Sequence, residues 1–173
     1  MKARLLAIYD DVERRARTTN EAHAWWPCKR GCDLCCRRLA DVPRMGKDEW
    51  ALLREGIEAL APAVRAGVDA RLAALRDHRG GHVVCPLLDQ AEGACLVYAH
   101  RPGACRTYGY YVERGDVLGC SRVLEAARES GEEDAIVWGN EDGVRYALAT
   151  LSGEPLPLTE WLALDPPRPP PEE

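Results

Sequence analysis

Residues 28–36 read Cys28-Lys29-Arg30-Gly31-Cys32-Asp33-Leu34-Cys35-Cys36, so that four cysteines occupy nine positions with the spacing C-x3-C-x2-C-C. Short loops of two or three residues allow successive thiolates to converge on one metal, while the intervening amides donate hydrogen bonds to sulfur. Gly31 lets the backbone turn tightly inside the segment. We therefore predict a metal-binding loop here.

A second group of cysteines begins about 50 residues later and has longer spacings. Such spacings fit ligands that separate turns deliver to a site assembled by the fold. Eight thiolates exceed the four that one closed tetrahedral site uses, which leaves either two metals or one four-cysteine centre with spare structural or redox cysteines. The predicted metal ligands are Cys28, Cys32, Cys35, Cys36, Cys85, Cys95, Cys105 and Cys120.

The composition argues for reduced thiols. Eight cysteines in 173 residues are about 4.6%, below the roughly 8–10% of a disulfide scaffold. The apolar run Leu5–Tyr9 is closed by Asp10 and Asp11, so we expect no signal peptide and no membrane span. We expect a cytoplasmic protein, where thiols stay reduced.

Adjacent Cys35 and Cys36 add a constraint. Neighbouring side chains of an extended segment point to opposite sides, so the two fit two sites, or one ligand and one structural thiol, better than a single metal. A vicinal disulfide is the alternative, but its ring is strained and the expected compartment is reducing.

The first cysteine group is locally basic. Residues 28–38 contain four basic side chains and one acidic side chain, which gives a local charge of +3 in a chain of net charge -5. The basic residues are Lys29, Arg30, Arg37 and Arg38, and the acidic one is Asp33. Four thiolates around one zinc ion leave about -2, and these cations would offset that charge and favour bound thiolates. The alternative is that they are solvated surface charges.

Hydrophobic periodicity predicts a mostly α fold with helices around an irregular, cysteine-rich metal-binding region that holds a few short strands. The irregular region covers residues 85–120, and we expect a single domain over residues 1–165 with a disordered, proline-rich tail at 166–173. With no Phe and 6% aromatics, the core should consist of Leu, Val, Ile and Ala. The predicted helices cover residues 2–17, a hairpin that begins near Asp48 and continues from Pro62, residues 122–130, a segment after Asn140, and a short piece around Trp161.

The cysteine string, together with Cys85-Pro86-Leu87-Leu88 and the segment from Cys95 through Arg101-Pro102 to Cys105-Arg106, resembles the bacterial YkgJ-like, CxxCxxCC cysteine-cluster proteins. The resemblance covers about residues 25–120 and implies a small, mostly helical domain that chelates zinc or iron. Most members of that family have no assigned reaction, and one branch resembles iron–sulfur proteins of methyl transfer. The x3 spacing between Cys28 and Cys32 departs from the x2 of the family pattern, and we interpret it as a tolerated variant.

Other side chains near the cysteines are secondary candidates. His82 or His100 could complete a mixed site, although a surface histidine is the commoner case. The tyrosines at 108, 110 and 111 fit packing better than ligand stacking. Trp25 and Trp26 could shield the first group from solvent.

Three functions remain open: a metal-chelating protein that holds zinc or an iron–sulfur cluster, an iron–sulfur enzyme of redox or methyl-transfer chemistry, and a structural zinc module for partner binding. The spacing C-x3-C-x2-C also matches radical-SAM enzymes, but the large α/β barrel of those enzymes is not indicated. No Gly-x-Ser-x-Gly, Walker loop or His-Glu-x2-His is present. The charge argues against a nucleic-acid partner, so we expect a protein or small-molecule partner and no membrane.

Overall fold

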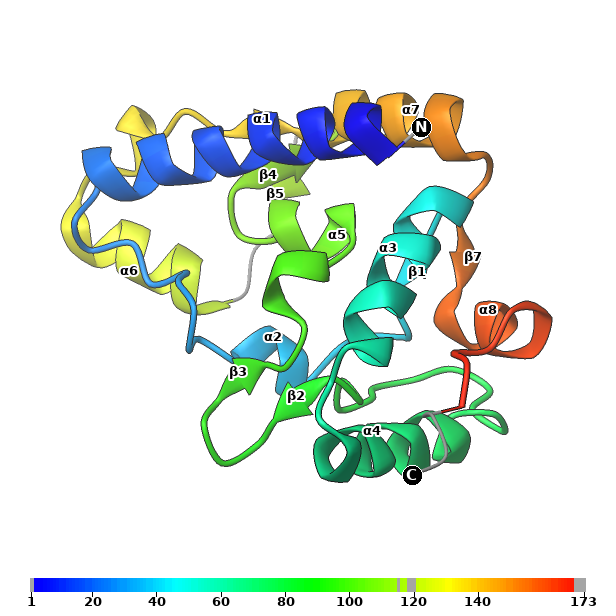
Figure 1. Cartoon of the computed structure of the whole chain (residues 1–173). Helices are drawn as coiled ribbons and strands as arrows, with labels where there is room; N and C mark the ends of the chain where they lie inside the picture. The colour runs from blue at the N-terminus through cyan, green and yellow to red at the C-terminus, as the bar shows by residue number, and fades with distance from the viewer. Residues whose placement is uncertain (1, 115, 118–120, 170–173) are drawn as a thin grey trace.

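The computed structural model of the chain describes residues 2–114, 116–117 and 121–169. Its long helix α1 (Lys2–Ala22) runs along one side of the molecule and packs against α7 (Glu141–Ser152) and the short α5 (Gly103–Thr107), as Figure 1 shows. The other helices are α2 (Leu34–Arg37), α3 (Lys47–Glu58), α4 (Pro62–Ala74), α6 (Ser121–Ser130) and α8 (Leu158–Leu164), with 3-10 turns η1 (Tyr98–His100) and η2 (Glu133–Ala135).

The strands are two or three residues long and serve as local ties between helices. Strand β1 (Arg44–Met45) pairs antiparallel with β7 (Leu156–Pro157), and β2 (Leu88–Asp89) pairs antiparallel with β3 (Ala94–Cys95). Strand β4 (Tyr111–Glu113) lies between antiparallel β5 (Asp116–Val117) and parallel β6 (Gly139–Asn140). The fold is therefore mostly α, as predicted.

The largest core lies between α3, α4 and α8. The rings of Trp50 and Trp161 stack there with centroids 6.3 Å apart, against Ile57 and Val68, which are fully buried. The prediction of an aliphatic core was wrong in this respect, because Trp50 and Tyr9 are among the largest fully buried side chains. Few aromatic residues are present, but each buries a larger apolar area than an aliphatic side chain and so contributes more to the core.

Local boundaries differ from the predictions at three places. Helix α1 continues to Ala22, and α3 begins directly after Gly46, so that Asp48 lies inside the first turn instead of capping it. Residues 34–37 of the predicted loop form a helical turn, in which the amide of Arg37 donates to the carbonyl of Asp33 at 2.9 Å. The predicted helix after Asn140 is confirmed, since the Asn140 side chain accepts from the amide of Gly143.

The proline-rich end contacts the helical hairpin as far as it is described. The Arg168 guanidinium donates to Glu58 at 2.6 Å, and Arg65 donates to the carbonyl of Arg168 at 2.8 Å. Residues 170–173 lie outside the described part of the chain. Among the described residues, no helix has the length and apolarity needed to cross a membrane.

A buried carboxylate joins three parts of this framework. Glu49, on α3, is only 4% exposed, and its Oε1 accepts from the Tyr9 hydroxyl at 2.9 Å and from the Gly103 amide at 2.8 Å. Its Oε2 accepts from the Gly46 amide at 2.9 Å. One side chain therefore fixes α1, the start of α3 and the start of α5.

We predict that Glu49→Gln lowers the free energy of unfolding by about 2 kcal/mol, because the amide nitrogen would face the N–H of Gly46 and leave that buried donor unpaired. Urea titration under reducing conditions measures the change. Glu125→Gln, on the exposed side of α6, is the control and should have no effect. A Glu49→Gln protein as stable as the control would show that the carboxylate is not needed.

A second buried carboxylate, that of Glu141, has fewer hydrogen-bond partners than that of Glu49. Glu141, at the start of α7, is 5% exposed, and within the described residues its Oε2 has no hydrogen-bond partner. Burial raises its pKa to about 7, against the lowering effects of a hydrogen bond with Thr107 and of the charge of Arg145, while Glu113 and Asp142 raise it further. The folded protein therefore binds a proton at Glu141 more tightly than the unfolded chain does.

We predict a stability that falls as the pH rises from about 4.5 to about 7, since the raised pKa favours the protonated folded state below that window. The expected loss is about 2–3 kcal/mol, and Glu141→Gln should abolish it and make the protein more stable than the parent at pH 8. Urea titrations at several pH values give the difference between variant and parent, with Glu125→Gln as the control. Parallel pH profiles for parent and Glu141→Gln would contradict this account.

Candidate metal centre

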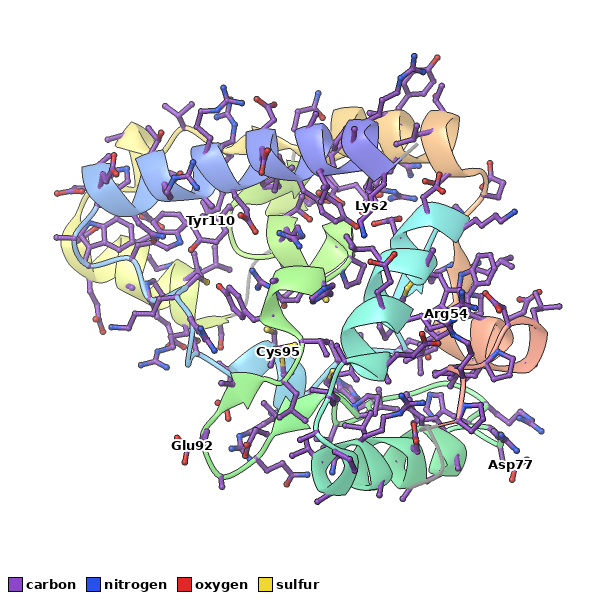
Figure 2. All side chains as sticks on the ribbon, in the orientation of Figure 1. Lys2, Arg54, Asp77, Glu92, Cys95 and Tyr110 are labelled. Carbon is purple, nitrogen blue, oxygen red and sulfur yellow. The ribbon has the colours of Figure 1, made fainter. Side chains whose placement is uncertain are left out.

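All seven described cysteines line one cavity of about 570 Å3, which α1, α2, α5 and the β2–β3 hairpin surround. Figure 2 shows the labelled Cys95 in the middle of the molecule, close to α2 and below α5. The seven are Cys28, Cys32, Cys35, Cys36, Cys85, Cys95 and Cys105, and no disulfide joins any two of these described residues. The eighth predicted ligand, Cys120, lies outside the described residues.

Backbone pairing brings the two cysteine groups together. Leu39 and Val83 form an antiparallel bridge with two hydrogen bonds of 2.9 and 3.0 Å, and the amide of Cys85 donates to the carbonyl of Cys36 at 2.7 Å. The Cys36 thiol consequently lies within hydrogen-bond reach of the Cys85 thiol, and the Cys35 thiol within reach of that of Cys36.

The helical turn changes the interpretation of the adjacent pair. Because Cys35 and Cys36 lie on α2 and not on an extended segment, their side chains do not point to opposite sides, and the expectation based on that geometry was wrong. The two thiols contact one another without a disulfide. Both can therefore take part in one site.

The β2–β3 hairpin places Cys95. In the antiparallel pairing of β2 with β3, Leu88 lies opposite Cys95, and the Leu96 amide donates to the carbonyl of Leu87 at 2.9 Å. Arg37 anchors this hairpin to α2, because its guanidinium binds the Asp33 carboxylate at 2.5 Å and the carbonyl of Gln90 at 2.9 Å. Of the four cations in the first group, Arg37 thus has a structural role.

Two arginines of the Arg-Pro-x2-Cys-Arg segment hold the backbone between Cys95 and Cys105. Arg101 lies over the Tyr98 ring at 3.5 Å and donates to the carbonyls of Tyr98 and Cys105 at 3.0 and 3.3 Å. Arg106 donates to the carbonyls of Arg101 and Ala99 at 2.8 and 2.6 Å. The irregular turn is therefore fixed by guanidinium groups instead of by strand or helix ladders.

Arg106 also ties this turn to α1. Its guanidinium pairs with Glu13 and lies 4.1 Å from the centre of the Tyr9 ring, and the residue is 6% exposed. Burying an arginine is favourable only when most of its N–H groups find acceptors, and here three acceptors surround it. The geometry identifies a positioning residue that sequence analysis named only as part of the family motif.

The Cys28 end of the cavity is packed against aromatic rings. Tyr110 stacks on Trp26 with centroids 5.8 Å apart and donates through its hydroxyl to the carbonyl of Cys28 at 2.5 Å. Gly109 has a φ of +88°, and a Cβ there would lie 2.6 Å from the Cys28 sulfur. Close approach of the thiol therefore requires glycine at this position, and the predicted packing role of Tyr110 agrees with these contacts.

Five of the thiols form a tighter set, which we call the central cysteine group: Cys35, Cys36, Cys85, Cys95 and Cys105. Burial, together with the charge of the neighbouring Cys36, raises the pKa of the Cys105 thiol to about 12. For Cys36, a hydrogen bond with Cys35 lowers the pKa, but the hydrogen bond with Cys85 and burial outweigh it, and the pKa is about 12. The hydrogen bond with Cys36 and burial likewise raise the pKa of Cys35, and burial raises that of Cys95.

The remaining cations of the first cysteine group are exposed at the cavity. Lys29, Arg30 and Arg38 are exposed and line the cavity, where Arg30 lies 5.5 Å from the centre of the Tyr98 ring. Arg17 of α1 joins them at the cavity wall. Sequence analysis did not single out Arg17, because nothing in the helical period distinguishes a cavity wall from open solvent.

The histidines considered as extra ligands do not line this cavity. His82 is exposed, and His100 packs against Gly56 of α3, where an added Cβ would meet its ring at 2.6 Å. Within the described ranges, no three His, Cys, Asp or Glu side chains are already gathered as closely as a metal ion requires. The described thiols therefore share one cavity but are not pre-arranged as a closed metal site.

A mostly helical chain in which separate segments deliver thiols to one cavity defines a cysteine-cluster protein. The family model described as "CxxCxxCC: Putative zinc- or iron-chelating domain" matches residues 27–132, more than half of the chain. The chain belongs to this family. No curated protein and no solved structure matches it.

We predict that Arg106→Lys is nearly as damaging as Arg106→Gln, each lowering the free energy of unfolding by about 2 kcal/mol, because an ammonium group cannot reach three acceptors on different sides. Urea titration of the reduced protein measures both. Arg128→Lys, on the exposed side of α6, is the matched control. If Arg106→Lys were as stable as the parent, charge and not geometry would be the property that matters.

Proposed function

We propose that this protein chelates a metal centre through thiolates of the central cysteine group. The observation that carries the proposal is the convergence of thiols from α2, β3, α5 and the Cys85 turn on one cavity. Membership of a family described as zinc- or iron-chelating supports it.

The donor set fits sulfur-bound metals. Thiolates are the preferred ligands of structural zinc and of iron–sulfur clusters, and each of these centres takes four. Glu13, the one carboxylate that the described residues bring to the cavity wall, is paired with Arg106, so a carboxylate ligand is not available there. When bound, zinc would supply structural or Lewis-acid chemistry, and an iron–sulfur cluster would supply electron transfer.

The size of the cavity favours an accessible centre over a closed structural one. A structural zinc site is enclosed by its four ligands, whereas this cavity has the volume of a small-molecule pocket. This observation favours the redox or transfer role as the second candidate over a module that serves only for partner binding.

Anaerobic purification followed by metal and sulfide analysis and a visible spectrum tests the proposal. A brown protein with iron and sulfide assigns an iron–sulfur cluster, and a colourless protein with stoichiometric zinc assigns zinc. A protein that stays folded and metal-free, with all its thiols alkylatable after incubation with either metal, would overturn the proposal.

We predict that the double variant Cys36→Ser/Cys85→Ser binds its metal at least tenfold more weakly than the parent, because only three thiols of the central cysteine group remain. Cys28→Ser/Cys32→Ser is the matched control, since it removes two thiols from the same cavity but outside that group, and it should retain the metal. Equilibrium dialysis with metal analysis measures both, and circular dichroism verifies folding. Full metal content in the first variant, or loss confined to the second, would contradict the assignment.

A further inference from the structure

The mouth of the cavity carries more positive charge than the metal centre needs. Among the described residues, six basic side chains line the cavity, against Glu13 as the one lining carboxylate. A zinc ion or four-iron cluster with four thiolates contributes about -2, so a surplus of about three positive charges remains. Four of the basic residues, which we call the basic rim, are exposed: Arg17, Lys29, Arg30 and Arg38.

The two deeper cations are already used. Arg106 is bound to Glu13 and to two backbone carbonyls, and Arg101 to two carbonyls and the Tyr98 ring. The basic rim differs, because no ion pair within the described residues involves its four members. These side chains are therefore available to an external anion.

The cavity is also too large for a single metal ion alone. Its volume of about 570 Å3 lies within the range of about 300–1,000 Å3 typical of small-molecule pockets, whereas one ion fills the space of roughly one water molecule, about 30 Å3. Apolar side chains such as Leu39, Leu87 and Val97, together with the ring of Tyr98, line the walls. Such walls suit an organic body, and guanidinium groups suit its anionic oxygens.

We propose that the cavity binds a small organic anion, with its carboxylate or phosphate group on the basic rim and its apolar body between the rim and the thiols. The proposal rests on the proposed function, since the proposed metal ligands line the same cavity. If the basic rim served only to offset thiolate charge, its removal would weaken metal binding and leave no anion site to detect.

The test titrates the anaerobically purified, metal-loaded full chain, with metal content measured on the same sample. Benzoate, benzamide and benzamidine share one ring and carry charges of -1, 0 and +1, and inorganic phosphate is the fourth probe. We expect benzoate to bind at least tenfold more tightly than benzamide or benzamidine in isothermal titration calorimetry. If phosphate competes with benzoate, the basic rim binds oxyanions in general. If phosphate does not compete, the rim is selective for carboxylates, and either result supports the proposal.

The triple variant Arg17→Gln/Arg30→Gln/Arg38→Gln should retain its metal and bind benzoate at least tenfold more weakly. Arg4→Gln/Arg122→Gln/Arg128→Gln removes the same charge away from the cavity and should bind like the parent. Equal affinity for benzoate and benzamide, unchanged binding in the rim variant, or loss of metal from it would overturn the proposal. A parent without metal that still prefers benzoate would instead refute the metal centre and retain the anion site.

Discussion

The buried guanidinium of Arg106 is the interaction on which the site depends. The segment between Cys95 and Cys105 has little regular structure, so its backbone carbonyls need other donors. Arg106 supplies them from inside the molecule and, through Glu13 and the Tyr9 ring, connects the segment to α1. Because Glu49 fixes Tyr9 and the start of α5 in the same region, the position of Cys105 is determined by two buried charged groups.

Other contacts of the fold hold the remaining cysteine-bearing segments in place near Cys105. The bridge between Leu39 and Val83 sets Cys36 beside Cys85, and the β2–β3 hairpin, held to α2 by Arg37, presents Cys95. The Leu39–Val83 bridge and the contact of Arg37 with the carbonyl of Gln90 join segments far apart in the sequence, so the two cysteine groups line one cavity. Burial raises the pKa of Cys105, and the hydrogen bond with Cys85 together with burial raises that of Cys36 against the lowering effect of Cys35, so both thiols are neutral in the metal-free protein and a bound cation would favour their ionisation.

The sequence allowed the helices and the cysteine-cluster family to be predicted, because the amphipathic period of segments such as Trp50 to Ile57 and the cysteine spacings are local signals. It did not predict the helical turn at Cys35 and Cys36, since four residues are too few to show a period. The roles of Arg37 and Arg106 were also inaccessible, because their partners are carbonyls that only the tertiary fold brings near. Likewise, Arg17 lies on a polar helix face, and the period cannot tell whether such a face borders a cavity or solvent.

The central claim is that the cavity holds its metal through sulfur alone. X-ray absorption at the metal K-edge of the anaerobically purified full chain tests this most directly. The account predicts a first coordination shell of sulfur only, at about 2.3 Å for zinc. A shell with two or more nitrogen or oxygen neighbours at about 2.0–2.2 Å would contradict it.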